Sequence, residues 1–266
     1  MMRLYSEILS ILFIGHSLVA FDMPMMVQSF ARSEGIQTTV DTQITNGAPL
    51  KYNWENSSTA QGTDARQALR THGYDAVILT EGIPLRNHLE WSDTTTYAKN
   101  FQRLALKKNP QTQMFVYETW HSLNSGTGRP VEWDDEAHIP WRKRLDLDLP
   151  KWEAIVAALN EDRPRSSPPV RLIPAGQAFG YLNDEIAKGR VPGIRSIGDF
   201  FADDIHPNEI GYYFIALVQF ATIYGKDPDS LPAQVEAAWH KSIRVPPKLA
   251  ASLQKIVKEA VADHHR

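Results

Sequence analysis

A serine, a histidine and an aspartate that could carry hydrolytic chemistry lie near opposite ends of this sequence. Ser17 ends an apolar run in the stretch FIGHSL, and the stretch DDIHPN places Asp203 three residues before His206. At the mouth of a helix, this spacing lets the carboxylate reach the imidazole Nδ1 while Nε2 points toward a hydroxyl. Taken alone, the serine is typical of a turn between a strand and a helix, where it bonds its own backbone. The aspartate–histidine pair favours a nucleophile instead.

The elements that would position these residues follow from the apolar pattern. Short apolar runs alternate with helical stretches, which predicts a parallel sheet with helices on both faces, an α/β sandwich. The expected strands are residues 8–14, 36–43, 75–80, 113–119 and 170–175. The expected helices are residues 64–72, 96–108 and 178–188, with a long apolar helix after DDIHPN. Ser17 would then lie just past the first strand, at the edge where such sheets bind ligands.

Composition excludes several classes of protein. The chain has 28 basic and 31 acidic residues, a net charge of -3 and no dense basic block, so nucleic acid is not expected as a partner. No apolar run approaches the roughly 20 residues that cross a bilayer, so no membrane span is expected. The lack of cysteine excludes disulfides, thiolate metal sites and cysteine nucleophiles.

The N-terminal stretch up to Ala20 resembles a weak signal peptide. Glu7 interrupts it, and cleavage there would remove Ser17. As written, the sequence therefore predicts a cytoplasmic protein. An export signal lost upstream would make the protein periplasmic or secreted.

We expect one α/β domain over residues 1–266, with two additions. Residues 118–150 are rich in Trp, Pro, Gly and charge and have no clear period, which predicts a folded insertion near the sheet edge. Residues 230–266 are expected to form a helical extension, for packing or for an oligomer contact.

The two polar blocks resemble those of SGNH (GDSL-type) hydrolases. FIGHSL is similar to their serine-bearing block, with His16 in place of the usual aspartate, and DDIHPN is similar to their Asp-x-x-His-Pro block. The resemblance extends over about residues 8–224 and implies a flavodoxin-like three-layer sandwich with a central parallel sheet of about five strands. It implies that Ser17 is the nucleophile, that His206 is the general base and then acid, and that Asp203 orients His206. It implies no cofactor and no metal, and we expect His16 to point away and stabilise its turn.

The resemblance also implies an oxyanion hole, which this sequence matches in part. The family's donors are the N–H of the serine, here Ser17, the N–H of a glycine after the second strand, here Gly47, and an asparagine side chain after the third strand. LTEGIPLRN stands where that asparagine block is usual, and an ionised Glu81 cannot donate. Either another side chain donates the third hydrogen bond, a protonated Glu81 donates it, or the two backbone donors suffice. If Glu81 is not a donor, it is a local cap or accepts a hydrogen bond from a substrate hydroxyl. The candidate side chains are Asn46, Thr80 and Asn87.

For substrates, the resemblance allows carbohydrate O-acetyl esters, thioesters, lysophospholipids and aryl esters, and acyl transfer to acceptors other than water. Trp120 and His121 follow the fourth predicted strand, and Trp133 and Trp141 lie in the insertion. These rings would form either a sugar-stacking surface or the core of the insertion. We expect a serine esterase for short acyl esters, with O-acetyl groups on a carbohydrate as the favoured substrate.

Two rival readings remain open. Asp134, Asp135, Glu136 and His138 crowd the insertion with ligand types that metals use, although their spacing matches no known site. A metal-dependent hydrolase is the first rival. A binding module with an inactive serine is the second, because Glu81 disturbs the third block.

Overall fold

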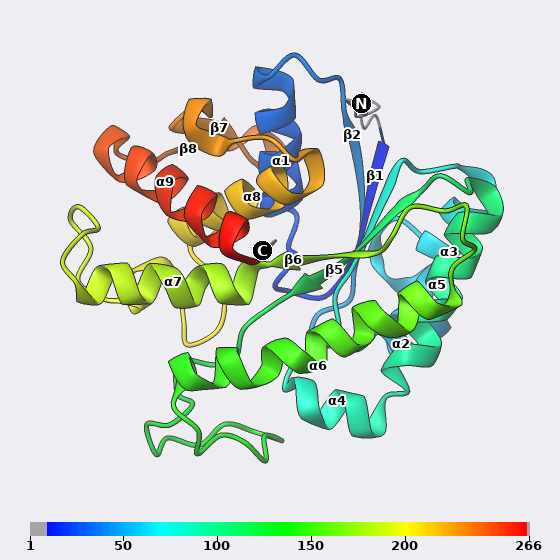
Figure 1. The fold of residues 1–266 in the computed structure, drawn as a ribbon, viewed down its shortest axis with the longest axis horizontal. Helices are drawn as coiled ribbons and strands as arrows, with labels where there is room; N and C mark the ends of the chain where they lie inside the picture. The colour runs from blue at the N-terminus through cyan, green and yellow to red at the C-terminus, as the bar shows by residue number, and fades with distance from the viewer. Residues whose placement is uncertain (1–9, 265–266) are drawn as a thin grey trace.

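The computed structural model describes residues 10–264 and places a mostly parallel sheet between two layers of helices (Figure 1). The sheet has six strands in the order β3-β2-β1-β4-β5-β6, so the chain begins at its centre and extends to both sides. Only β3 is antiparallel, as a two-residue edge strand paired with β2. The strands are β1 (Ser10–Gly15), β2 (Thr39–Ile44), β3 (Gln61–Gly62), β4 (Ala76–Leu79), β5 (Gln113–Glu118) and β6 (Arg171–Pro174).

Central strands are apolar throughout because both faces of the sheet are covered. Successive side chains of a strand point to opposite faces, so Ile11 and Phe13 of β1 pack into one core while Leu12 and Ile14 pack into the other. The first core is covered by α1 (Asp22–Ser33), α7 (Ala175–Ala187), α8 (Glu209–Tyr224) and α9 (Pro247–His264). The second is covered by α2 (Leu50–Glu55), α3 (Ala65–Thr71), α5 (Thr94–Lys108) and α6 (Trp141–Asp162).

The predicted α/β sandwich is confirmed, with small shifts at the element ends. All five predicted strands are present, although residues 8 and 9 of the first lie outside the described residues. β3 was not predicted, since two residues carry no periodic signal. No helix within residues 10–264 has the length and apolar character needed to cross a membrane.

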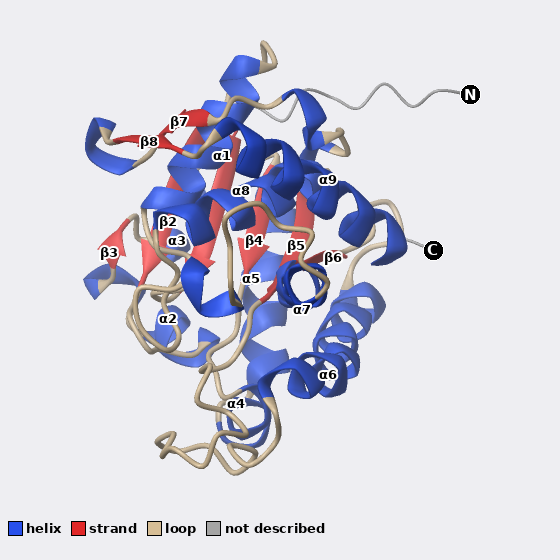
Figure 2. Ribbon diagram, turned by 90° about the vertical axis from the view of Figure 1, so that its left-hand side faces the viewer, coloured by secondary structure: helices blue, strands red, loops and turns tan. Residues whose placement is uncertain are grey.

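The segment after β5 differs from the prediction. The irregular stretch ends at Pro140 rather than at residue 150, because α6 begins at Trp141 and contains Pro150 in its interior. A proline inside a helix costs about 3 kcal/mol. Here the buried side chains of Trp141, Leu145 and Trp152 pack α6 against both cores, which offsets that cost. A short helix, α4 (Leu85–Trp91), lies near this segment (Figure 2).

The C-terminal extension is not wholly helical. An antiparallel pair, β7 (Gln234–Glu236) and β8 (Ser242–Arg244), precedes α9 and lies beside α1 (Figure 2). The turn between the two strands contains a short 3-10 helix, η4 (Ala238–His240). Further 3-10 helices are η1 (Ser57–Thr59), η2 (Ile197–Phe200) and η3 (Pro228–Ser230).

Candidate active site

The structure brings Ser17, His206 and Asp203 together at the carboxyl end of β1. His206 Nε2 lies 2.9 Å from Ser17 Oγ, and His206 Nδ1 lies 2.8 Å from Asp203 Oδ2. The serine is part-buried, while the side chains of the histidine and the aspartate are 41% and 52% exposed. The hydroxyl, the imidazole and the carboxylate thus form a continuous hydrogen-bonded chain that a substrate can reach from solvent.

The surroundings of Asp203 fix the orientation of the imidazole. Asp203 Oδ1 accepts hydrogen bonds from the backbone N–H groups of Ile205 (2.8 Å) and His206 (2.6 Å), which leaves Oδ2 for the ring. Partial burial pushes the pKa of Asp203 upward, but these hydrogen bonds and the one from the ring outweigh it and hold the pKa below its usual value. The ionised carboxylate accepts from Nδ1–H, so Nε2 presents its lone pair to Ser17 Oγ.

Two tyrosine hydroxyls hold the turn that carries Ser17. Tyr212 Oη donates to the carbonyl of Ser17 (3.1 Å), and Tyr117 Oη donates to the carbonyl of Leu18 (3.2 Å). Gly15 ends β1 where a Cβ would lie 2.4 Å from Thr80 Cγ2, so only glycine fits. The serine therefore has a fixed backbone, as a preorganised nucleophile requires.

The loop that carries His206 is closed on itself and capped. Ala202 N–H donates to the carbonyl of His206 (2.8 Å), and Asn208 N–H donates to the carbonyl of Phe200 (2.9 Å). The side chain of Asn208 then accepts from two N–H groups in the first turn of α8. A side-chain cap of this kind ties the histidine loop to α8, a helix buried along most of its length in the first core.

Trp120 is placed differently from the sequence prediction. Its side chain is fully buried, stacked edge-on against Phe179, and its Nε1 donates to the carbonyl of Ile205 at 2.9 Å. The ring does not line the cavity next to Ser17. Trp120 thus supports the histidine loop from the core, and the prediction of direct substrate contact is corrected to a positioning role.

The segment after β5 fixes the same loop at a second point. Leu123 N–H donates to the carbonyl of Asp204 (2.6 Å), and Ser122 Oγ donates to its carboxylate. His121, also predicted to contact substrate, is buried instead, and its Nε2 is hydrogen-bonded to Asp148 of α6. Burial lowers the pKa of His121, against the opposing effect of Asp148. The insertion therefore braces the site.

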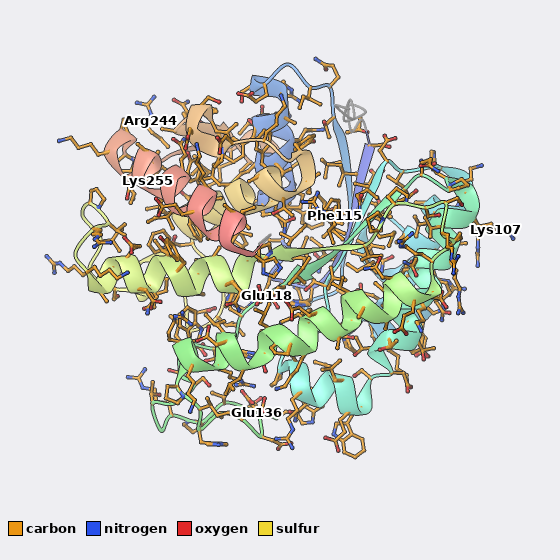
Figure 3. All side chains as sticks on the ribbon, viewed as in Figure 1. Lys107, Phe115, Glu118, Glu136, Arg244 and Lys255 are labelled. Carbon is orange, nitrogen blue, oxygen red and sulfur yellow. The ribbon has the colours of Figure 1, made fainter. Side chains whose placement is uncertain are left out.

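Two acidic residues of the insertion loop, Asp134 and Glu136, are paired with cations of α6. Arg144 is fully buried and forms a two-point ion pair with Asp134, while Lys151 Nζ lies 3.0 Å from Glu136 and 2.6 Å from Asp148. Glu136 lies in the loop near α6 (Figure 3). Within residues 10–264, no three His, Asp or Glu side chains are grouped so that they could hold a metal ion. The acidic run has a structural role in anchoring the loop to α6.

A cavity of about 480 Å³ opens beside Ser17 Oγ. Its walls come from the loops after β1, β2 and β4 and from the histidine block. The lining residues are His16, Ser17, Leu18, Asn46, Gly47, Gly82, Ile83, Ile205 and His206. Of the three side chains considered as oxyanion donors, Asn46 alone lines this cavity.

Gly47 lies in a turn that lines the cavity. Its φ is 68°, in the left-handed region that favours glycine, and it adjoins Asn46 in a tight turn after β2. Among the described residues, no hydrogen-bond partner is found for the backbone N–H of Ser17 or of Gly47, or for the side chain of Asn46. All three residues line the cavity, so they stay the candidates for an oxyanion hole.

The other two donor candidates are engaged elsewhere. Thr80 Oγ1 donates to the carbonyl of Tyr117 at 2.8 Å, and Asn87 Nδ2 donates to the carbonyl of Trp133 at 3.0 Å. Both side chains are buried outside the cavity lining. Thr80 and Asn87 are therefore corrected from donor candidates to structural residues.

Glu81 lies behind the cavity wall. Its Oε1 accepts from the N–H of Leu50 (2.9 Å) and the N–H of Gly82 (2.6 Å). Burial raises the pKa of Glu81 to about 7, while the two N–H groups act in the opposite direction. Because its carboxyl is buried and does not line the cavity, the predicted contact with substrate is replaced by a clamp between two loops that do.

His16 is buried and bonds within its own turn and to the neighbouring loop. Its Nε2 lies 2.9 Å from the carbonyl of Glu81, to which it donates, and its Nδ1 accepts from Leu18 N–H at 3.4 Å. Burial lowers the pKa of His16 to about 4, so the ring is neutral in both bonds. This matches the expected turn-stabilising role, although one edge of the residue reaches the cavity.

Sequence reasoning missed the groups that brace the site from a distance. Tyr117 and Tyr212 hold the turn of Ser17 and carry no motif, and Asn208, the last residue of DDIHPN, was not assigned its role as the cap of α8. A cap signal was present, since asparagine after His-Pro at the start of a long apolar run is typical of a helix N-terminus.

Comparison with known proteins yields structural neighbours only, since no protein-family model and no curated protein matched the sequence. A DUF4886 family protein from Bacteroides uniformis aligns over 97% of this chain and 96% of its own, with a TM-score of 0.63 and 14% identity. A carbohydrate esterase family 3 protein from Talaromyces cellulolyticus aligns over 82% and 97%, with a TM-score of 0.53 and 15% identity. A protein described as a GDSL-like lipase from Parabacteroides merdae aligns over 82% and 95%, with a TM-score of 0.53 and 12% identity. At such identities the likeness establishes the fold: this chain has an α/β sandwich similar to those of carbohydrate esterases and GDSL-like lipases.

Proposed function

We propose that this chain is a serine esterase that cleaves short acyl esters through an acyl-enzyme, with O-acetyl groups on a carbohydrate as its substrate class. The observation that carries the proposal is the chain of two hydrogen bonds from Ser17 Oγ to His206 Nε2 and from His206 Nδ1 to Asp203 Oδ2. Its place at the carboxyl end of a central parallel strand is where this fold type binds ligands. The fold shared with carbohydrate esterases and a GDSL-like lipase supports it further.

In the first half of the reaction, Ser17 Oγ attacks the ester carbonyl carbon and passes its proton to His206 Nε2. The carbonyl oxygen gains negative charge and accepts from the N–H groups of Ser17 and Gly47 and from Asn46 Nδ2. One such donor is worth about 3 kcal/mol of transition-state stabilisation. The intermediate collapses when the bond to the leaving alcohol breaks and His206 gives that alcohol the proton.

In the second half, His206 takes a proton from water, whose oxygen attacks the acyl carbon. Collapse of the second tetrahedral intermediate releases the carboxylic acid and returns the proton to Ser17 Oγ. Asp203 stabilises the imidazolium formed in each half, and its own hydrogen bonds keep it ionised.

Cavity shape supports a short acyl group. The apolar side chains at the cavity, Leu18, Ile83 and Ile205, line a space of about 480 Å³ shared by the acyl and alcohol parts of an ester. A palmitoyl chain would fill most of it. We expect acetyl esters to be cleaved faster than palmitoyl esters, and the reverse order would point to a lipid hydrolase.

The proposal is tested by hydrolysis of p-nitrophenyl acetate with Ser17→Ala and His206→Ala as paired variants. Each is expected to lower kcat by several orders of magnitude, and the double variant should lose little more, because the residues act as a unit. Activity should survive EDTA and persist in Asp135→Ala. Loss of turnover on chelation, together with near-normal kcat in Ser17→Ala, would overturn the serine mechanism in favour of a metal. No turnover of any ester by a folded protein would favour the inactive binding module.

A further inference from the structure

One tryptophan outside the cavity lining stands out by the exposure of its side chain. Trp239 lies in the turn between β7 and β8 with 81% of its surface exposed, the largest value among the exposed large hydrophobic residues. Single exposed apolar side chains are normal on protein surfaces, and Trp91 and Trp133 are exposed as well, so exposure alone assigns Trp239 no role.

The backbone that presents Trp239 is strained. Trp239 and the following His240 have φ values of 55° and 59°, in the left-handed region where residues other than glycine are uncommon. Each such residue costs of order 1 kcal/mol and persists only where the surroundings enforce it. Strain of this kind gathers at binding sites, and here it projects an indole ring into solvent.

Three contacts enforce this turn. Ala237 N–H donates to the carbonyl of Lys241 at 2.7 Å and closes the turn. Ala238 N–H donates to Asp22 Oδ1 at 3.2 Å, and Lys241 Nζ lies 2.6 Å from Glu209 Oε1. The turn is therefore tied to the first turns of α1 and α8.

These tethers place the turn of Trp239 at the same sheet edge as Ser17 and His206, although Trp239 itself does not line the cavity. Asp22 follows Ser17 by five residues, and Glu209 follows His206 by three, so both anchors start helices at the sheet edge that carries the site. The hydroxyl of Tyr212 connects the two regions. It donates to the carbonyl of Ser17, and its pKa is raised by burial and by the charges of both Asp22 and Asp203.

Phe21 supports the indole from one side. The rings of Phe21 and Trp239 meet edge to face, with centroids 5.8 Å apart at 62°. Phe21 itself is packed on the first core and precedes α1 directly. A partner ring worth about 1 kcal/mol limits the motion of Trp239, and the high exposure shows that most of the indole is left open to a ligand.

The surroundings of the ring favour a sugar over a protein partner. The neighbours of Trp239 in its turn are polar, with His240 94% exposed at its side chain and Lys241 about half exposed. A stable protein interface buries about 800 Å² on each partner around an apolar centre, which one ring among charges does not provide. A pyranose ring needs one aromatic face for its C–H groups and polar groups for its hydroxyls.

We propose that Trp239, backed by Phe21, is a platform for a pyranose ring in the alcohol part of the ester, so that it selects carbohydrate esters over simple ones. This inference rests on the proposed esterase function. The sugar would stack on the indole while its acyl group enters the cavity at Ser17. The exposed side chains of His240 and Lys241, which follow Trp239 in the turn, could bond the sugar hydroxyls while they keep their partners Glu236 and Glu209.

The test replaces Trp239 without disturbing its backbone. Asparagine tolerates the left-handed conformation, so Trp239→Asn removes the ring and keeps the turn, while Trp239→Tyr keeps an aromatic ring. Trp91→Ala is the matched control, because Trp91 is also exposed, at 66%, but lies at the end of α4. The substrates are acetylated xylo-oligosaccharide and p-nitrophenyl acetate.

We expect Trp239→Asn to raise KM for the sugar ester by about tenfold or more with kcat nearly unchanged, and to leave p-nitrophenyl acetate unaffected. Trp239→Tyr should recover part of the loss, and Trp91→Ala should match wild type. Equal effects on both substrates, or no effect on either, would overturn the platform while leaving the esterase proposal intact.

A binding measurement keeps the two proposals separate. Unacetylated xylo-oligosaccharide should quench tryptophan fluorescence of the full chain in wild type and in Ser17→Ala, but not in Trp239→Asn. If no ester is hydrolysed and this quenching is still seen, the esterase proposal fails and the platform stands. If Trp239→Asn retains the quenching, or instead converts a dimer to a monomer in sedimentation, the platform is overturned.

Discussion

Replacement of Glu81 by glutamine is expected to change how the stability of the protein depends on pH. The carboxyl is 1% exposed, and its Oε1 alone accepts from Leu50 N–H and Gly82 N–H. The amide oxygen of glutamine can accept both hydrogen bonds, so Glu81→Gln keeps them and removes the titration of the carboxyl. Its NH₂ group takes the place of Oε2, which has no hydrogen-bond partner among the described residues, and any cost of that exchange does not depend on pH. His16, bonded to the Glu81 carbonyl, and the nearby His88 both have pKa values lowered to about 4 by burial, so they stay neutral above pH 5.

The magnitude follows from the shift in pKa. Burial raises the pKa of Glu81 from 4.5 to about 7, so the folded state binds the proton more tightly than the unfolded state. When the pKa of a carboxyl is higher in the folded state, the protein loses stability as the pH rises from the unfolded-state pKa to the folded-state pKa. At 1.36 kcal/mol per unit, the loss is about 1 kcal/mol at pH 5 and about 3 kcal/mol at pH 8.

The assay is urea unfolding of wild type and Glu81→Gln at several pH values from 5 to 8. The free energy of unfolding of Glu81→Gln minus that of wild type should increase by about 2 kcal/mol over this range. Glu118, whose pKa burial raises to about 8, is present in both proteins, so its effect cancels. A difference that stays constant with pH would refute the reasoning, because Glu81 would then keep one charge state throughout.

Two further predictions concern the reaction itself. Asn46→Ala should lower kcat for p-nitrophenyl acetate by about 10²-fold with little change in KM, as expected for a donor that acts on the transition state. A rise in KM alone in steady-state kinetics would show that Asn46 binds only the ground state of the substrate. Asp203→Asn should lower kcat by up to about 10⁴-fold, since the amide Oδ1 can still accept from the N–H groups of Ile205 and His206 while its NH₂ group faces Nδ1 and enforces the wrong tautomer. Unchanged circular dichroism and melting would show that Asp203→Asn is folded, and a near-normal kcat in that protein would remove Asp203 from the proposed mechanism.

Local signals in the sequence predicted the sheet and the residues around Ser17. The apolar strands are short, bounded by turn residues and buried on both faces, so their runs are readable without tertiary information. The block DDIHPN works in the same local way, because the aspartate, the histidine and the helix cap interact over a few residues. Gly47 lies in a turn after β2, where the resemblance places a glycine donor, and its role in the oxyanion hole stays a prediction.

The wrong assignments came from side chains whose direction the sequence does not encode. Trp120 and His121 follow β5 as expected, but their side chains turn into the core because Ile205 and Asp148 offer buried hydrogen-bond partners there. The insertion was predicted to reach residue 150, but α6 begins at Trp141 and its tertiary packing keeps Pro150 inside the helix. Trp239 was missed because its exposure depends on a turn whose tethers, Asp22 and Glu209, lie far away in sequence.

The most direct test of the central claim is covalent labelling with a fluorophosphonate, followed by peptide mapping in a mass spectrometer. Phosphonylation needs a nucleophile that the imidazole activates, so the wild-type chain should gain one adduct, located on Ser17. His206→Ala should label far more slowly, although its serine is intact. Absence of an adduct in folded wild-type protein, or an adduct on another residue with Ser17 unmodified, would contradict the account.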